Sequence, residues 1–318
     1  MTIKKAIEQY LNYRTSLGEK HRSNRYALLS FSSAIGHECD INNVTLEQCN
    51  DYLNHKGRKG GNVTSYWFKI HTALKGFFEW CYTRGLLDII PLPIFLPPKP
   101  NQFIPYIYTN DELQVIFDFA LCYRKYYKVS YPEVIQNILK TIYFLGLRPS
   151  EAIRLNMSDI HLEDDSYALI RDSKFYKTRM VPFNSKVKAM LSSFLIWRKK
   201  VGMTDDGDSP LFFDKKGKRV NLGCLQKAFR CICEKANIKR NTNTSHSDVR
   251  LQDLRHTFAT NRVLSWYRKG KNVQELLPML SAYLGHEKLD STAVYISFVP
   301  ELIAEAGDLF YNYYQNSY

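Results

Sequence analysis

Two arginines in this 318-residue chain stand in contexts that suit the binding of an oxyanion. Arg148 follows an apolar run, and Pro149 after it favours the first position of a new helix. Glu151 then falls in the first turn of that helix, close enough to hold the Arg148 side chain in place. A guanidinium fixed in this way can donate two parallel hydrogen bonds to an anion. The alternative is an ordinary structural arginine–glutamate pair.

The other arginine, Arg255, stands beside His256 in the sequence LQDLRHTFAT, for which we predict a helix. Neighbouring residues on a helix point in different directions, so we expect only one of this pair to face a given site. Gln252 lies three residues before Arg255 and therefore on the same face. The segment thus supplies a second cation with an amide beside it.

Three further residues stand out by their position. Lys174 lies at the tip of a predicted hairpin, where it could donate a proton to a ligand, although an exposed turn lysine is the common alternative. His286 follows Gly285, which ends a helix, and Tyr295 lies on the next short helix. Because the chain has 22 tyrosines, Tyr295 is singled out by its position after Leu-Gly-His and not by its type.

The elements that must position these residues fall into two parts separated by prolines. Six prolines occur between residues 91 and 105. Proline fixes its own φ and pushes the preceding residue out of the helical region, so residues 91–105 predict an extended linker. We therefore expect two domains, residues 1–90 and residues 106–318.

Residues 1–90 predict an all-helical domain. Apolar residues recur at helical spacing from Val63 to Phe78, and we expect this helix to start at Asn62 and to stop at Gly85. Before it, the sequence HKGRKGG forms a basic loop that either contacts phosphates or is simply solvated. The candidate DNA-binding residues in this loop are Lys56, Arg58 and Lys59.

Residues 106–318 predict a mainly helical domain with a small antiparallel β insert. Two β-prone runs, residues 167–170 and 179–182, flank residues 172–177 and predict the hairpin that carries Lys174. Helices are predicted over residues 134–147, 185–200, 222–236, 251–264, 273–284 and 291–298.

The charge balance favours a polyanionic partner. Lys and Arg number 44 against 31 Asp and Glu, a formal net charge of +13, which most often indicates nucleic acid. A basic surface kept for solubility is the alternative. No segment reaches the roughly 20 uninterrupted apolar residues of a membrane helix, and the first residues lack the apolar core of a secretion signal. We expect a protein of the bacterial cytoplasm or nucleoid, with no membrane association.

The cysteines indicate neither disulfides nor a metal site. There are seven of them, an odd number scattered along the chain, which argues against a disulfide framework. Cys231 and Cys233 are spaced C-x-C, and no second pair completes a zinc site. We expect buried or inert thiols.

The order and the residues of these motifs resemble those of the tyrosine recombinase (phage integrase) family. That family carries arginine in a G-L-R-x-x-E phrase and lysine in a hairpin before an R-x-V-P strand. The motifs H-x-x-R-H-T/S-F-A-T and L-G-H follow in that order. The nucleophilic tyrosine lies nine residues after the histidine of L-G-H. The matching phrases are GLRPSE at 146–151, RMVP at 179–182 with Lys174 ahead of it, QDLRHTFAT at 252–260, and LGH at 284–286 followed by Tyr295. Four phrases in this order make the resemblance specific, and the helical first domain resembles the family's core-binding (SAM-like) domain.

The resemblance implies a site-specific recombinase, of the integrase or transposase type of a mobile element, that clamps double-stranded DNA between two domains. Arg148, Arg255 and His286 would bind the non-bridging phosphate oxygens, on which negative charge builds during attack. Tyr295 would form a 3′-phosphotyrosyl bond, and Lys174 would protonate the departing 5′-oxygen. No metal or cofactor is implied, because the cationic side chains supply the charge.

Glu151 would orient Arg148 in this scheme. One position of the chain departs from the family pattern. Gln252 stands where the family usually has the histidine of H-x-x-R. Glutamine can donate and accept hydrogen bonds but cannot take up a proton near neutral pH. A geometric role for the position therefore survives, whereas a general-base role does not. The departure leaves open a DNA-binding accessory protein of the same fold with weak or no cleavage activity. A type IB topoisomerase, which uses the same chemistry without strand exchange, is a further alternative.

The C-terminal tail carries an apolar helical stripe of Leu302, Ala306, Leu309 and Phe310, which Gly307 interrupts. In similar proteins the last helix docks on a neighbouring subunit within a tetramer on DNA. We therefore expect a homo-tetramer or a hetero-tetramer on DNA. The alternative is that the tail packs on its own domain.

Overall fold

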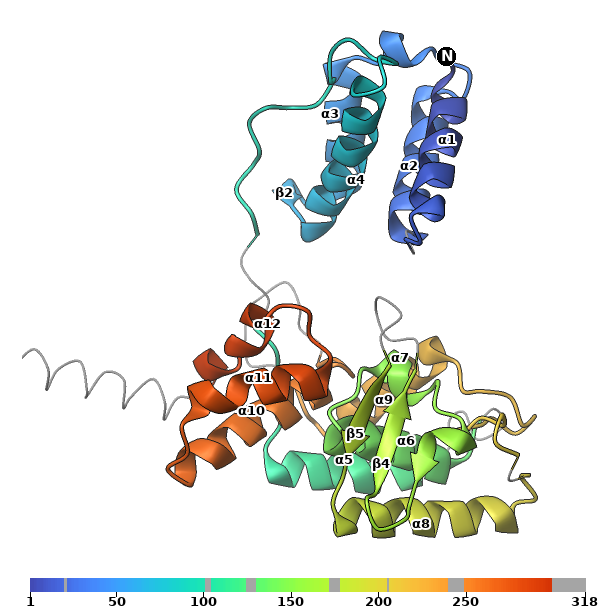
Figure 1. Ribbon diagram of the computed structural model, residues 1–318, viewed down its shortest axis with the longest axis vertical. Helices are drawn as coiled ribbons and strands as arrows, with labels where there is room; N and C mark the ends of the chain where they lie inside the picture. The colour runs from blue at the N-terminus through green and yellow to red at the C-terminus, as the bar shows by residue number, and fades with distance from the viewer. Residues whose placement is uncertain are drawn as a thin grey trace, which may run out of the picture. The chain divides into compact units, whose positions relative to one another are not determined.

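The computed structural model describes residues 1–19, 22–100, 104–123, 130–171, 178–204, 206–239 and 249–298 (Figure 1). The chain divides into two compact units, Met1–Phe103 and Ile104–Tyr318, and each unit is described by itself. Within the described residues, no helix is both long and apolar enough to cross a bilayer.

The described part of the first unit packs four α-helices around an apolar core. They are α1 (Ile3–Ser16), α2 (Arg22–Ile35), α3 (Leu46–Gly57) and α4 (Ser65–Tyr82), with a 3-10 turn, η1, at Ile41–Asn43. At the start of α3, the Gln48 N–H donates to the Thr45 hydroxyl and the Thr45 N–H donates to the Gln48 side chain, which is a capping box. The aromatic side chains buried in this core include Phe31, Trp67, Phe77 and Phe78.

A β-hairpin replaces the loop that the sequence predicted between α3 and α4. Its strands are β1 (Arg58–Lys59) and β2 (Asn62–Val63), paired antiparallel. The two glycines between the strands both have positive φ, a conformation that glycine adopts without strain. Because Asn62 pairs in this hairpin, α4 begins only at Ser65, and the predicted helix start is wrong.

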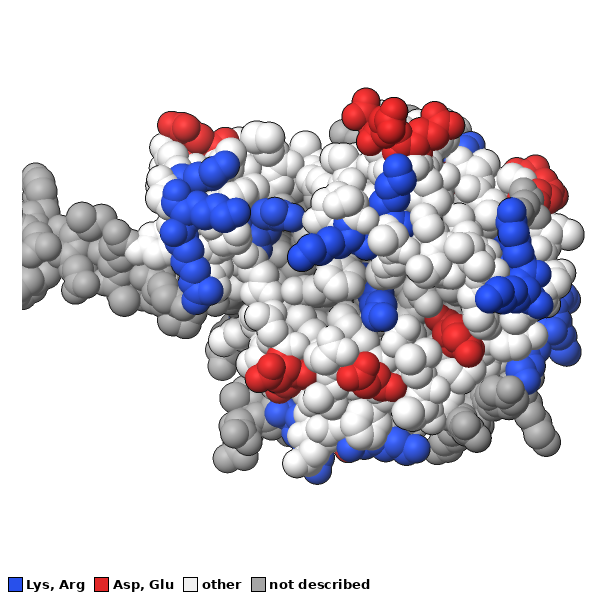
Figure 2. Space-filling view, turned by 90° about the horizontal axis from the view of Figure 1, so that it is seen from below, with Lys and Arg blue, Asp and Glu red and all other residues white. Residues whose placement is uncertain are grey.

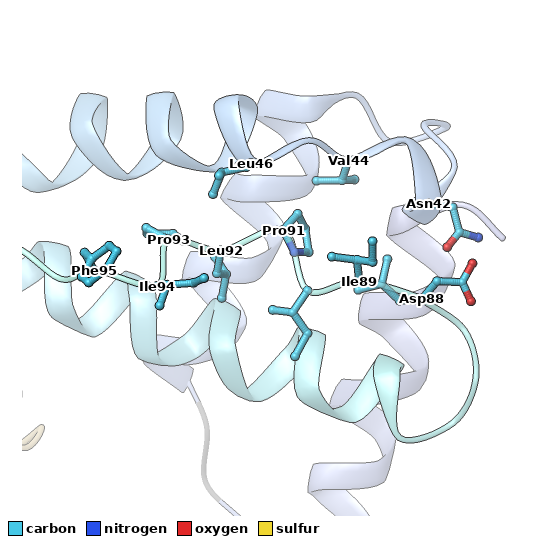
Figure 3. A pocket seen from close by; sticks show the side chains of 12 residues that line it. Asn42, Val44, Leu46, Asp88, Ile89, Pro91, Leu92, Pro93, Ile94 and Phe95 are labelled. Carbon is cyan, nitrogen blue, oxygen red and sulfur yellow. The ribbon is translucent and has the colours of Figure 1, made fainter.

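The chain leaving α4 packs back on the first unit and lines an apolar groove (Figure 3). Leu87 and Leu92 are buried in the core of this unit. The groove has a volume of about 720 Å³ and is lined from its other side by Val44 and Leu46. The proline-rich stretch that the sequence predicts as a linker therefore begins as part of the packed first unit.

The second unit is mainly helical with a small antiparallel sheet. Its longer helices are α5 (Asn110–Cys122), α6 (Pro132–Phe144), α8 (Ser185–Lys200), α9 (Leu222–Lys235), α10 (Asp253–Arg268) and α11 (Val273–Leu284). Its short elements are α7 (Pro149–Ala152), η2 (Met157–Asp159), α12 (Asp290–Ala293) and η3 (Ile296–Phe298). The strands β3 (Ile160–His161), β4 (Tyr167–Ile170) and β5 (Arg179–Pro182) lie in the order β3-β4-β5. The predicted fold class is confirmed, with β3 as a strand that the sequence did not predict.

Helix α6 forms the centre of this unit because it is apolar on nearly every side. Ile138, Leu139 and Ile142 are fully buried, and the helix packs against α5, α8 and α10. A proline at its first position supplies a φ suited to a helix start. The rigid end of α6 then leads directly into the turn that carries Arg148.

Positive charge is not gathered into one patch on the face of the second unit shown in Figure 2. This view looks from the side on which α8 lies in Figure 1. Lys and Arg side chains occur there in separate groups, with acidic and uncharged side chains between them (Figure 2). The described residues of this face therefore do not form the continuous basic surface that a polyanion would favour.

Candidate active site

One buried carboxylate, Glu151, gathers three arginines from distant parts of the chain. Arg148 Nη1 donates to its Oε1 at 2.6 Å, and Arg179 donates from Nη1 and Nη2 to Oε1 and Oε2 at 3.1 and 2.8 Å. Arg255 Nη1 lies 3.6 Å from Oε2. Burial by itself would raise the pKa of Glu151, but Arg179 and then Arg148 outweigh it and hold the pKa at about 2. Three cations around one ionised carboxylate leave an excess of two positive charges.

The turn between α6 and α7 presents Arg148. Gly146 in this turn has φ 59°, in the left-handed region that favours glycine. The Arg148 N–H donates to Glu151 Oε2 at 2.9 Å, and its Nη2 donates to the Gly285 carbonyl at 3.0 Å. The Arg148 side chain is 25% exposed, so part of it faces solvent.

Arg255 comes from the first turn of α10 and its side chain is only 1% exposed. Its Nη1 donates to the Gly146 carbonyl at 3.0 Å, and its Nη2 donates to the Leu284 carbonyl at 2.7 Å. Burial, followed by the charge of Arg148, lowers the pKa of Arg255 to about 10. The group is therefore charged at neutral pH, and it ties the turn after α6 to the end of α11.

His286 directly follows Gly285, whose φ of 69° ends α11 in the left-handed conformation. Its Nδ1 lies 2.8 Å from the hydroxyl of Thr292, a fully buried residue of α12. Burial, followed by the charges of Arg255 and Arg148, lowers the pKa of His286 to about 3, so the ring is neutral at neutral pH. When Nδ1 accepts from Thr292, the ring proton sits on Nε2, which can donate to a ligand.

Tyr295 lies in a turn between α12 and η3, so the prediction that it lies on a helix is wrong. The residue is 1% exposed. Its ring centroid lies 5.8 Å from that of His256 and 6.2 Å from that of His286. Tyr295 Oη is 3.1 Å from His256 Nδ1 and lies close enough to the Arg255 guanidinium for that charge to affect its pKa. Burial raises the pKa of Tyr295, and the charge of Arg255 opposes that rise.

The expectation that only one of Arg255 and His256 faces the site is also wrong. Both side chains contact Tyr295, because the tyrosine lies against the first turn of α10 and reaches the two diverging side chains together. Burial lowers the pKa of His256 to about 4, although the charge of Asp253 opposes the shift. The ring is therefore neutral at neutral pH.

Gln252 is the N-cap residue of α10. The N–H groups of Arg255 and His256 both donate to its backbone carbonyl, at 3.1 and 3.3 Å. Gln252 also lines a cavity of about 410 Å³ together with Arg148 and Ser150. The glutamine therefore lies on the same cavity as Arg148, where an amide can hydrogen-bond a ligand.

The structure brings together four of the five residues predicted as catalytic, namely Arg148, Arg255, His286 and Tyr295. The fifth, Lys174, lies outside the described residues. Sequence reasoning did not assign Arg179, although the R-x-V-P phrase that contains it was a usable signal, and it gave no role to His256 or Thr292. In the part of the chain that the structure describes, no group of three or more His, Cys, Asp or Glu side chains could hold a metal ion.

Comparisons with known proteins show which family and fold the chain shares. The profile of the phage integrase family matches residues 109–300. The protein y4rB of Sinorhizobium fredii, named as an integrase/recombinase, is 28% identical over 308 residues that cover 96% of each chain. The tyrosine recombinase XerC of Escherichia coli O127:H6 is 26% identical over 302 residues, covering 91% of this chain and 90% of XerC.

Solved structures share the fold. The XerH site-specific recombinase bound to its palindromic difH substrate superposes with a TM-score of 0.66 at 23% identity, covering 90% of this chain and 78% of XerH. The Tn1549 transposon integrase in complex with a circular intermediate DNA gives a TM-score of 0.67 at 18% identity, covering 93% of this chain and 95% of that one.

The chain belongs to the phage integrase family, the tyrosine recombinases, as its motifs predicted. The predicted enzyme class, a site-specific recombinase, is confirmed at this level, and the accessory-protein alternative is not favoured.

Proposed function

We propose that this recombinase cleaves and rejoins double-stranded DNA with Tyr295 as its nucleophile. The observation that supports this proposal most strongly is that Tyr295, Arg255 and His286 lie together, although they come from three separate stretches of the second unit. A phenol beside cationic and neutral hydrogen-bond donors suits attack on a phosphodiester. The product is a 3′-phosphotyrosyl bond, which conserves the bond energy until a second strand attacks.

The arginine cluster supplies the charge that the reaction needs. Negative charge grows on the non-bridging phosphate oxygens as Tyr295 attacks, and Arg148 and Arg255 bring an excess of positive charge to that point. His286 adds a neutral donor through Nε2. Glu151 fixes the positions of both arginines before DNA arrives, so little reorganisation is needed during the reaction.

The scissile phosphate must approach from the exposed side of Arg148. Arg255 and Tyr295 are each about 1% exposed, whereas Arg148 is 25% exposed and borders the 410 Å³ cavity. Attack therefore requires Tyr295 to be uncovered. The segment that carries Tyr295 consists of a four-residue helix, a turn and a 3-10 turn. Such short elements rearrange at a small cost in free energy.

Two further assignments complete the proposal. Lys174, on the segment before β5, would protonate the 5′-oxygen that leaves. The first unit would bind DNA through the exposed basic residues of its hairpin region, Lys56, Arg58 and Lys59. Arg58 also braces the hairpin, because its Nη1 donates to the Gly61 carbonyl at 2.9 Å.

Covalent trapping tests the proposal. A binding site is first selected from random-sequence duplexes with the full chain, and a nicked duplex with this site then prevents religation. Wild type and the matched control Tyr82→Phe, which alters an exposed tyrosine of the first unit, should form a covalent DNA adduct. Tyr295→Phe should bind the duplex and form none. An adduct in Tyr295→Phe, or its absence in wild type, contradicts the proposal.

We propose a tetramer on DNA for the complete reaction, because two duplexes must each be cut twice. The tail residues 301–318, which would link the subunits, lie outside the described residues. A chain truncated after Pro300 should still form the adduct but lose cooperative assembly on DNA in sedimentation experiments. Full cooperative assembly by the truncated chain contradicts this part.

A further inference from the structure

We propose that His256 is a catalytic residue whose Nδ1 accepts the proton that Tyr295 loses when it attacks the phosphate. This assignment deepens the proposed function and rests on it. It gives a role to a histidine that lies on α10 next to Arg255 and that no other step of the reaction uses.

The contact itself is direct. His256 Nδ1 lies 3.1 Å from Tyr295 Oη, which is hydrogen-bond distance from the atom that must form the new bond to phosphorus. His286, the other ring near Tyr295, stacks against it at 6.2 Å between centroids and directs its Nδ1 to Thr292. Of the two histidines, His256 is therefore the one whose Nδ1 meets the nucleophilic oxygen.

The surroundings keep His256 neutral and able to accept. It lies in the first turn of α10, where the helix dipole disfavours a cation. The charged groups that face it are Arg250, Asp253 and Arg255, and their effects on its pKa partly cancel. Burial adds to this, so the ring is uncharged before DNA binds. In the tautomer with the proton on Nε2, the free Nδ1 accepts from the phenol.

The position of His256 beside Arg255 keeps it near the phosphate that Tyr295 must reach. Arg255 holds the phosphate, and the Cα of His256 is one residue away on a rigid helix, about 3.8 Å. Because both residues lie near Tyr295 before it moves, a tyrosine that reaches a phosphate on Arg255 stays in the neighbourhood of His256 after its segment has been uncovered. Moreover, Gln252 cannot serve instead, because its amide has no basic nitrogen.

The proton transfer balances. The Tyr295 Oη–phosphorus bond forms, the bond from phosphorus to the 5′-oxygen breaks, and the phenol proton moves to His256 Nδ1. A proton from the general acid goes to the 5′-oxygen. The phenol is a weak acid before attack and a strong one once its oxygen bonds to phosphorus, so transfer to a weakly basic imidazole becomes favourable as the bond forms. In the rejoining step, His256 returns the proton to the departing Tyr295.

Single-turnover adduct formation on the selected nicked duplex tests this role. His256→Asn keeps a side chain that can hydrogen-bond the phenol but cannot take its proton, and His256→Phe removes both properties. We expect both variants to bind the duplex and to form the adduct at least about 100-fold more slowly than wild type. The matched control is His161→Asn, at a half-exposed histidine of β3 that stacks on Tyr167, and it should react at the wild-type rate.

Each other outcome overturns the assignment in a recognisable way. Adduct formation by His256→Asn within about tenfold of wild type, with His256→Phe slow, shows that His256 only orients the phenol. Wild-type rates or faster in both variants show that the contact merely covers Tyr295. If wild type itself forms no adduct, the proposed function fails and this assignment fails with it.

Discussion

Arg179 holds both carboxylate oxygens of Glu151 with its two terminal nitrogens, at 3.1 and 2.8 Å, while its Nε donates to the Tyr283 carbonyl at 2.9 Å. The side chain is 11% exposed, so it is placed to support the site and not to meet DNA. By pairing with Glu151 in two prongs, Arg179 fixes the carboxylate on which Arg148 and Arg255 converge. The strand β5 thereby connects the sheet to the end of α11.

The first prediction concerns Glu151→Gln and pH. The native pKa of Glu151 is lowered from 4.5 to about 2, so its contribution to stability is fully present above about pH 4.5. That contribution is lost as the pH falls from about 4.5 towards 2. We expect the variant to be less stable than wild type by about 3 kcal/mol at pH 7, and the difference to shrink below pH 4.5. Urea unfolding of both proteins at several pH values measures it.

Glu234→Gln is the matched control, because it makes the same chemical change on an exposed face of α9. It should change the free energy of unfolding by less than about 0.5 kcal/mol. Equal stability of Glu151→Gln and wild type at pH 7 would show that the three arginines can lie together without the Glu151 carboxylate.

The second prediction concerns Gly285→Ala. Gly285 has φ 69°, and a Cβ there would lie 2.9 Å from Arg179 Nη1. Arg179 cannot move aside, since Glu151 and Tyr283 hold it. Gly202→Ala is the control, because Gly202 has φ 82° with nothing within 4 Å of its added Cβ and therefore reports strain alone.

We expect Gly202→Ala to lower the free energy of unfolding by about 1–2 kcal/mol and Gly285→Ala to lower it clearly more. Urea unfolding of the two variants provides the comparison. If the two substitutions cost the same, Arg179 is not fixed as the structure indicates.

The third prediction concerns Thr292, whose hydroxyl lies 2.8 Å from His286 Nδ1 and, when it donates, favours the tautomer with the proton on Nε2. Thr292→Val keeps the shape but removes the hydroxyl, and Thr292→Ser keeps the hydroxyl. Loss of one hydrogen bond of about 1 kcal/mol should slow adduct formation roughly five- to tenfold in the valine variant, with the serine variant near wild type. Nitrogen NMR of the His286 ring should show less of the Nε2–H form in the valine variant. An unchanged tautomer ratio contradicts the prediction.

The sequence predicted most of the helices well because helices depend on local signals, and short motifs singled out four residues that the structure brings together. Helices α8 and α11 begin and end at the residues that the sequence predicted, 185–200 and 273–284. Arg148 and Glu151 are three residues apart, so their contact follows from helix geometry. The class of site could be recognised for the same reason, since each motif is a short phrase.

The failures have a common physical cause in long-range packing. Arg179 meets Glu151 across 28 residues, and His256 meets Tyr295 across 39, so no local pattern encodes either contact. The helix predicted around Tyr295 breaks into two short turns, because the tyrosine packs against α10. The hairpin before α4 was missed because a two-residue strand carries almost no periodicity.

The fourth prediction tests the basic hairpin region of the first unit. Lys56 and Lys59 are exposed, and removing one lysine–phosphate ion pair should reduce the slope of log binding constant against log salt concentration by about 0.9. We expect the double variant Lys56→Gln, Lys59→Gln to lower the slope by up to about two. The control pair Lys4→Gln, Lys5→Gln, on the exposed face of α1, should leave it unchanged. Filter binding at several salt concentrations distinguishes the two pairs, and equal slopes would remove the hairpin from the DNA interface.

The fifth prediction concerns Gln252→His, which restores the residue that the family usually has. Gln252 caps α10 and shares a cavity with Arg148, whereas the contact to Tyr295 Oη comes from His256. Exchanging one neutral hydrogen-bonding side chain for another near the phosphate changes the free energy by about 1 kcal/mol. Adduct formation should therefore stay within about tenfold of wild type. A rise of several hundredfold in the rate of adduct formation would show that Gln252 strongly lowers the activity of the native enzyme. It would also show that the base which limits the reaction belongs at residue 252 and not at His256.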